Sequence, residues 1–151
     1  MPKPRDRSGR ARSLSRKLAM QALYQWQLTG QSCAELCSQF GADESYADAD
    51  AGYFITLLQG IVGAGDALDA ELGALLDRPV AQLDPVEHAV LLIGLYELAN
   101  QPEVPYRVVI NEGVELAKRF GASEGHKFVN AVLDRAARTH REAEQAAAAR
   151  A

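Results

Sequence analysis

The sequence predicts an all-α protein, and three observations support that fold class. Apolar residues recur every three or four positions through most of the 151-residue chain, as on one face of an amphipathic helix. No stretch between turn signals alternates apolar and polar residues, so no β-strand is expected. Hydrophobic residues make up 48% and charged residues 24%, an ordinary globular composition in a chain long enough to bury a core. We therefore expect about seven helices in two small packed bundles, with approximate ranges 13–78 and 82–139.

The N-terminal residues 1–12 differ from the rest of the chain in composition. They contain two prolines and a glycine, and they offer little apolar surface to bury, so we expect a flexible basic arm. Residues 1–18 hold seven basic side chains and one acidic side chain, although the whole chain has a net charge of -4. Nucleic acid is therefore a candidate partner despite the acidic pI near 5.4.

Four helices are expected in the first half of the chain. The first begins at Ser13 or Ser15 and ends at Thr29, because Gly30 is a typical helix-terminating residue. Glycines near the end of the third helix predict a break before the fourth. An acidic connector over residues 41–50 separates the second helix from the third. The second, third and fourth helices cover residues 33–39, 53–62 and 66–76.

The second half begins with a strong helix-start signal. Asp84 can cap the helix, Pro85 suits its first position, and Glu87 stands at the capping-box position. Residues 86–99 are apolar nearly all round, so this helix should be central. Two amphipathic helices follow within residues 104–138, the second with Ser123 as its expected N-cap. The Ala-rich residues 140–151 lack bulky apolar side chains, so we expect a frayed tail.

Motifs for catalysis or for metal binding are absent from the sequence. There is no phosphate-binding glycine loop, nucleophile elbow or zinc-binding histidine pair. Cys33 and Cys37 lack the two further ligands that a metal site needs, and they favour a reducing cytoplasm. Glu112 and Glu115 are typical of a solvated helix face. We expect no catalytic residue, metal or cofactor, and no membrane association, since no apolar run approaches ~20 residues.

Basic and aromatic residues give the clearest functional signal. Lysines and arginines that neutralise phosphates release counterions, so the basic arm favours nucleic acid, although it could equally be a solvated tail. Tyr24 lies seven residues after Lys17 on the same helical face, where it could stack on an unpaired base or pack into the core. Phe128 could likewise pack inward or face a partner. Glu87 could cap its helix or pair with a basic partner.

Three parts of the chain closely resemble the NusB family of bacterial transcription antitermination factors. They are ALYQWQL at residues 22–28, DPVEHAVLLIGLYEL at residues 84–98, and VPYRVVINEGVELAKRFG followed by HKFVNAVLD within residues 104–134. The resemblance runs from about Arg12 to Ala137 and implies an all-helical fold of two small bundles.

The resemblance also implies a function and a set of contact residues. It implies binding to the boxA sequence of nascent ribosomal RNA transcripts as a heterodimer with NusE, a small-subunit ribosomal protein. The pair would help assemble an antitermination complex on RNA polymerase, and the free protein could be a homodimer. The implied RNA-binding residues are Lys3, Arg5, Arg7, Arg10, Arg12, Arg16, Lys17 and Tyr24. The implied edge for NusE or RNA consists of Glu87, Glu124 and Phe128.

Three alternatives remain open at this point. A helical adaptor could bind only protein and use its basic arm for solubility. An RNA-binding module related to the ribosomal RNA cytosine methyltransferases would be expected to continue into a catalytic domain, which this sequence does not contain. A small helical enzyme is the third alternative, and no residue set supports it.

Overall fold

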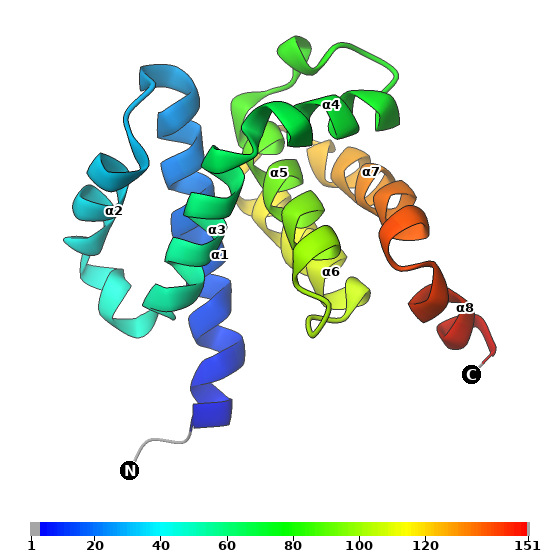
Figure 1. The fold of residues 1–151 in the computed structure, drawn as a ribbon, viewed down its shortest axis with the longest axis horizontal. Coiled ribbons are helices and arrows are strands. Elements are labelled where there is room, and N and C mark those ends of the chain that lie inside the picture. Colours follow the sequence, from blue (N-terminus) through cyan, green and yellow to red (C-terminus); the bar gives the residue numbers. More distant parts are fainter. Residues whose placement is uncertain (1–3, 151) are drawn as a thin grey trace. The chain divides into compact units, whose positions relative to one another are not determined.

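The computed structural model describes the backbone of residues 4–150 and the side chains of residues 9–150. Within residues 4–150 it contains eight α-helices, two short 3₁₀ helices and no β-strand, which confirms the predicted all-α class (Figure 1). The chain divides into two compact units, Met1–Ala64 and Gly65–Ala151. The expected boundary between residues 78 and 82 is therefore wrong, because the helix at residues 65–75 belongs to the second unit.

The first unit packs its helices around Phe54. It contains α1 (Pro4–Thr29), α2 (Cys33–Gly41), η1 (Glu44–Asp48) and α3 (Ala51–Gly63). The ring centroid of Phe54 lies 6.3 Å from that of Phe40 on α2 and 5.7 Å from that of Tyr46 on η1. The connector expected over residues 41–50 thus holds a 3₁₀ helix that covers this core. The fully buried large side chains of the unit are Leu18, Leu23, Leu36, Phe54, Leu57, Leu58 and Ile61.

The start of α1 corrects one expectation from the sequence. The helix begins at Pro4 rather than at Ser13 or Ser15, so residues 4–12 continue α1 instead of forming a separate arm. Proline is favoured in the first turn of a helix, and arginine and alanine are good helix formers. The helix also has a tertiary contact here, because the carbonyl of Ala11 accepts a hydrogen bond from the Asp50 N–H at 3.2 Å.

The second unit is built around α5. It contains α4 (Gly65–Leu75), η2 (Val80–Gln82), α5 (Pro85–Asn100), α6 (Tyr106–Phe120), α7 (Gly125–His140) and α8 (Glu142–Arg150). As predicted, α5 is buried on most sides, and the Asp84 carboxylate accepts a hydrogen bond from the Glu87 N–H at 3.3 Å. The expected break between the third and fourth helices lies at Ala64.

Two histidine–carboxylate contacts explain why α4 belongs to the second unit. His88 of α5 lies 2.6 Å from Asp69 of α4, and His140 of α7 contacts Glu71 of α4. Leucines on α4 are buried as well, so the helix has both polar and apolar attachments to this unit. No helix within residues 4–150 is by itself long and apolar enough to cross a membrane; only α3 and α4 taken together meet that criterion.

The helices α5, α6 and α7 converge on Leu133. A Cβ atom added at Gly94 of α5 would lie 2.6 Å from the Leu133 Cδ2 atom, and one at Gly113 of α6 would lie 2.9 Å from its Cδ1 atom. These distances are too short for a larger side chain without movement of the leucine. The two glycines therefore let the three helices approach each other closely, and this packing fixes the positions of α6 and α7.

The C-terminal segment is helical over residues 142–150, so the expected frayed tail over residues 140–151 is wrong for the described part. This segment has no bulky apolar anchor, and α8 is instead held by the side chain of Arg141, which is 7% exposed. Its guanidinium donates hydrogen bonds to the carbonyls of Glu97, Leu98, Gln101 and Val104 and to the carboxylate of Glu144. Three of these carbonyls lie at the end of α5; those of Glu97 and Gln101 also accept backbone N–H groups, and that of Leu98 is paired by Arg141.

Candidate nucleic-acid interface

One face of α1 carries three of the predicted RNA-binding residues. Arg10, Lys17 and Tyr24 are spaced by seven residues, which is about two turns, or about 10.5 Å along the helix. Arg10 is exposed, Lys17 is half-buried and the Tyr24 side chain is 39% exposed. We call these three residues the α1 stripe. It places two cations and one aromatic ring on a single rigid helix face.

Two other predicted RNA-binding residues make contacts within the first unit. The guanidinium carbons of Arg12 and Arg16 lie 4.2 and 5.4 Å from the ring centroid of Tyr53 on α3. Arg12 also has its Nε atom 3.7 Å from an Asp50 carboxylate oxygen. Arg16 is only 3% exposed, which argues against a direct contact with phosphate. Both arginines join α1 to α3.

A serine on α1 strengthens this attachment. The buried Ser15 hydroxyl donates a hydrogen bond to the Asp50 carbonyl at 2.7 Å and accepts one from the Asp50 N–H at 3.0 Å. The Asp50 carboxylate in turn caps α3 by accepting a hydrogen bond from the Tyr53 N–H at 3.0 Å. The orientation of α1 relative to α3 is therefore fixed by polar contacts as well as by the core.

Three of the predicted RNA-binding residues lie wholly or partly outside the described part of the chain. Arg5 and Arg7 belong to α1, but their side chains are outside the described part, and Lys3 lies outside the described residues altogether.

Lys17 lies close to Asp43 of the connector. The pKa of Asp43 is lowered chiefly by hydrogen bonds from Ser45 and to a smaller extent by the charge of Lys17.

The predicted partner edge lies where α5 begins and α6 turns into α7. The carboxylate of Glu87 is directed at this turn, where it accepts a hydrogen bond from the Ala122 N–H. A Cβ atom added at Gly125 would lie 2.1 Å from a Glu87 carboxylate oxygen, so glycine makes room for this side chain. Glu87 is 9% exposed, so it fastens the turn in addition to any contact with a partner.

Two further residues complete this edge. Glu124, rather than the expected Ser123, is the N-cap residue of α7; it has a φ of 68° and makes no side-chain cap bond. Its exposed carboxylate lies 2.5 Å from the ammonium of Lys127. Phe128 is half-buried, with the guanidinium carbon of Arg78 located 4.7 Å from its ring centroid. Glu87, Glu124 and Phe128 thus lie around one turn, and we call them the α7 edge.

The burial of Glu87 leads to a prediction about stability. Burial, followed by the charge of Asp84, raises the pKa of Glu87 above its ordinary value, although the Ala122 N–H and Arg78 oppose the shift. A raised pKa means that the folded state favours protonated Glu87. The contribution of Glu87 to the free energy of unfolding is therefore fully present below about pH 4.3 and is lost as the pH rises through the pKa of the folded state. Glu87→Gln should therefore raise the thermal midpoint at pH 7 relative to wild type, with a smaller difference at pH 4.

Thermal unfolding followed by circular dichroism from pH 4 to pH 8 measures this difference. Glu103→Gln, at an exposed position in the loop between α5 and α6, is the control for loss of one negative charge. A Glu87→Gln variant that is less stable than wild type at pH 7 would mean that the Ala122 contact outweighs burial.

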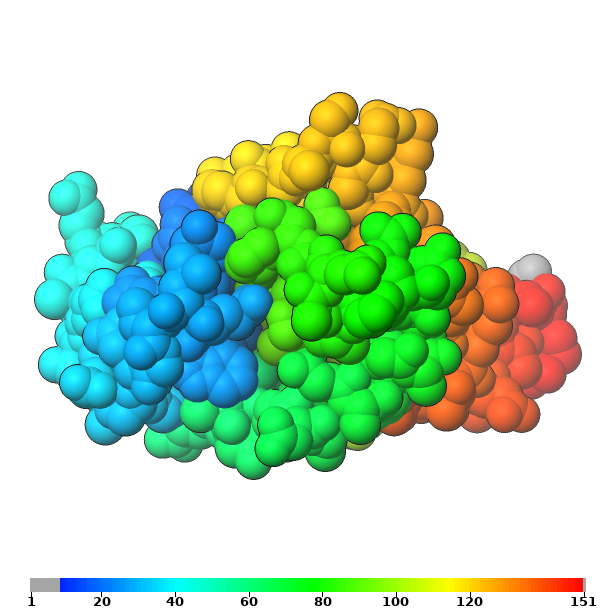
Figure 2. Space-filling model, turned by 90° about the horizontal axis from the view of Figure 1, so that it is seen from above, coloured from blue at the N-terminus to red at the C-terminus, as the bar shows by residue number. Residues whose placement is uncertain are grey.

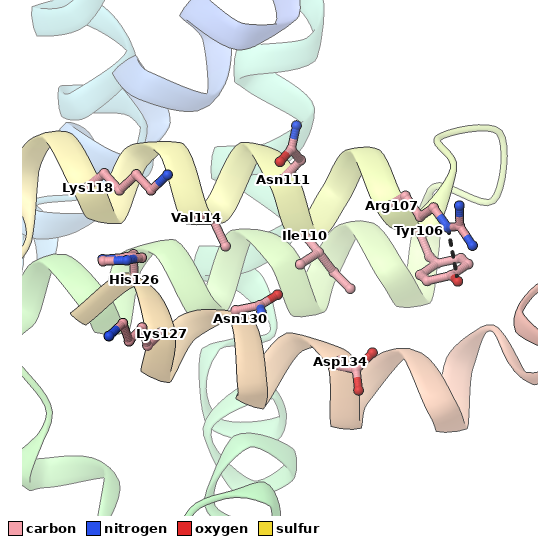
Figure 3. Close-up of a pocket in the computed structure, with 10 residues that line it drawn as sticks. All are labelled: Tyr106, Arg107, Ile110, Asn111, Val114, Lys118, His126, Lys127, Asn130 and Asp134. Carbon is pink, nitrogen blue, oxygen red and sulfur yellow. Dashed lines mark hydrogen bonds between the residues drawn. The ribbon is translucent and has the colours of Figure 1, made fainter. Parts of the chain in front are cut away.

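Sequence reasoning missed a groove between α6 and α7 (Figure 3). The groove has a volume of about 530 Å³, and its residues come from one face of each helix. It is lined by Tyr106, Arg107, Ile110, Asn111, Val114, Lys118, His126, Lys127, Asn130 and Asp134. The i, i+4 spacing of Tyr106, Ile110 and Val114 was visible in the sequence, but the facing residues of α7 depend on how the two helices pack.

The described residues form a small all-helical protein that presents basic and aromatic side chains on its helix surfaces, an arrangement that nucleic-acid-binding modules use. The family model described as the NusB family matches residues 13–138. The chain belongs to the NusB family.

Individual relatives agree with this assignment. The transcription antitermination protein NusB of Paraburkholderia phymatum is 49% identical over 140 residues, covering 93% of this chain and 97% of the relative. The protein of the same name from Marinomonas sp. is 48% identical over 151 residues, covering 97% and 87%. The solved structure of T. maritima NusB has a TM-score of 0.77 at 27% identity, covering 91% and 93%.

Proposed function

We propose that this protein is a transcription antitermination factor that binds boxA of nascent ribosomal RNA transcripts as a heterodimer with NusE. The pair helps assemble an antitermination complex on RNA polymerase, which locates the protein in the cytoplasm. The shared name of its relatives supports the antitermination role. The observation that supports RNA binding most directly is the α1 stripe of Arg10, Lys17 and Tyr24.

The proposed mechanism is recruitment, without a chemical step. Arg10 and Lys17 neutralise phosphates of an unpaired segment, while the exposed ring of Tyr24 offers a surface on which a base can stack. Arg12 and Arg16 act indirectly, because their contacts with Tyr53 hold α1 in place. A rigid helix face loses little entropy when the RNA binds, which favours the complex.

NusE is proposed to bind the α7 edge. Phe128 supplies a half-buried aromatic anchor, and Glu124 supplies an exposed carboxylate next to it. A second protein bound here extends the RNA-binding surface and raises the affinity for RNA by coupling the two binding events.

The test is a double variant, Arg10→Gln with Lys17→Gln, in the full chain. The logarithm of the association constant for boxA RNA falls linearly with the logarithm of the salt concentration, and single strands contribute about 0.7 to the steepness for each phosphate. Loss of two phosphate contacts should therefore make this slope shallower by about 1.4. Filter binding or fluorescence anisotropy measures the slope with and without NusE. The salt concentration is varied from about 50 to about 300 mM, roughly the range in which counterion release changes the affinity strongly.

The control variant is Arg135→Gln with Arg150→Gln, which removes two exposed positive charges outside the stripe. Its salt slope should remain close to that of wild type. Equal slopes for all three proteins would reject the α1 stripe as the RNA contact. A wild-type protein that binds NusE but no RNA would instead support the protein-only adaptor.

A further inference from the structure

We propose that the α6–α7 groove binds a short unpaired RNA segment, as a second contact in addition to the α1 stripe; this inference rests on the proposed RNA-binding function. The groove lies wholly within the second unit, on the surface formed by α6 and the first part of α7, which are yellow and orange in Figure 2. The distance along α6 from Tyr106 to Lys118 is about 18 Å, at about 1.5 Å per residue.

The centre of the groove suits a nucleobase. Ile110 and Val114 point from α6 toward α7 and provide an apolar surface (Figure 3). Asn130 points from α7 toward α6, so its carboxamide lies beside that surface. A carboxamide can both donate and accept hydrogen bonds, which is what the edge of a base requires. The central part thus combines an apolar surface with one group able to bond to a base edge.

Both ends of the groove carry positive charge. Lys118 and Lys127 supply the charge at one end, where His126 also lies (Figure 3). Arg107 lies beside Tyr106 at the other end, and its Nε donates a hydrogen bond to the Tyr106 hydroxyl at 3.3 Å. A nucleic-acid strand carries a phosphate at every nucleotide, so separated cations fit its charge pattern. Tyr106 is half-buried and adds an aromatic ring on which a base can stack.

Acidic residues near the groove pair with its lysines, but these pairs are exposed to solvent. Asp134 is the one carboxylate in the lining, and the Arg138 guanidinium donates to it at 2.8 Å. Lys118 lies 3.6 Å from Glu115, and Lys127 pairs with Glu124. Exposed pairs of this kind are worth little, so a phosphate can replace the carboxylate as the partner of each lysine.

The test uses two double variants. The groove variant carries both Lys118→Gln and Lys127→Gln, and the charge-matched control carries both Arg135→Gln and Arg150→Gln. The probe is boxA RNA with single-stranded extensions on both sides, bound to the full chain. The groove variant should lower the salt slope by about 1.4, while the control should not. Tyr106→Leu should weaken binding roughly tenfold at constant salt, which tests stacking independently of charge.

Photocrosslinking with 4-thiouridine in the extensions provides a direct readout, with crosslinked peptides expected from α6 and α7. If wild type binds the RNA but the groove variants bind equally well and no crosslink maps to α6 or α7, the groove proposal is wrong and the α1 stripe proposal stands. If wild type does not bind the RNA at all, both proposals are wrong. If the groove instead binds an acidic protein, the groove variants should bind RNA as wild type does and no crosslink should map to α6 or α7.

Discussion

Arg141→Met is expected to lower the free energy of unfolding by about 3–5 kcal/mol, because it removes a buried cation that has a full set of partners. The guanidinium donates to four carbonyls and one carboxylate, and the residue is 7% exposed. Methionine has a similar length but no donor, so the carbonyls of Leu98 and Val104 lose the bonds from Arg141, while those of Glu97 and Gln101 keep their backbone donors. In a chain of this length the thermal midpoint should fall by roughly 10 °C.

Arg138→Met is the matched control, since it makes the same chemical change three residues earlier. Arg138 is exposed and forms one pair, with Asp134 at 2.8 Å, so the expected cost is below about 1 kcal/mol. Urea unfolding of both variants at pH 7 compares the two costs. A difference of less than about 1 kcal/mol between them would show that the Arg141 contacts contribute little net stability.

The same substitution should also disturb the α6–α7 groove. Glu144, which pairs with Arg141, accepts a hydrogen bond from the Tyr106 N–H at 2.9 Å at the start of α6. Burial opposes ionisation of Glu144, but the bonds from Tyr106 and Arg141 outweigh it and lower the pKa of this carboxyl. The stabilisation from Glu144 is therefore present above its ordinary pKa and lost as the pH falls through the folded value. Acid strong enough to reach this lowered pKa of Glu144 should loosen the same attachment that Arg141→Met removes.

The sequence predicted the elements whose formation depends on local signals. The Asp84-Pro85 start of α5, the break at Ala64 and the Gly30 end of α1 all follow from residues within one or two turns. The α8 helix could not be found in this way. Its anchor is one arginine whose four carbonyl acceptors lie 37 to 44 residues away in the sequence, and no periodic pattern indicates such contacts.

The candidate interface was predicted only in part for a similar reason. The spacing of Lys17 and Tyr24 on one helix face was readable from the sequence, and Arg10 extends it by the same interval. Composition could not separate Arg10, which is exposed, from Arg16, which is 3% exposed, because burial is decided by the packing of Tyr53. The groove was missed because it requires the relative placement of α6 and α7.

That placement depends on Leu133, so Leu133→Ala is the second substitution with a large expected effect. It removes a side chain that is 1% exposed and contacts both α5 and α6, and the expected loss of unfolding free energy is about 2–5 kcal/mol. Because Leu133 immediately precedes Asp134 of the groove, the variant should also weaken binding of the extended RNA. Chemical unfolding and anisotropy on the same samples measure the two effects together.

Combining this variant with Gly94→Ala distinguishes close packing from helix propensity. In the wild-type background the new methyl group would lie 2.6 Å from Leu133 Cδ2, so an overpacking cost of about 1–3 kcal/mol outweighs the gain of about 1 kcal/mol from replacing a helical glycine. In the Leu133→Ala background the methyl group enters vacated space, so Gly94→Ala should become stabilising. A double-mutant cycle detects this change of sign. If Gly94→Ala stabilised both backgrounds equally, propensity alone would explain it, and the close approach of α5 and α7 would not limit the residue at position 94.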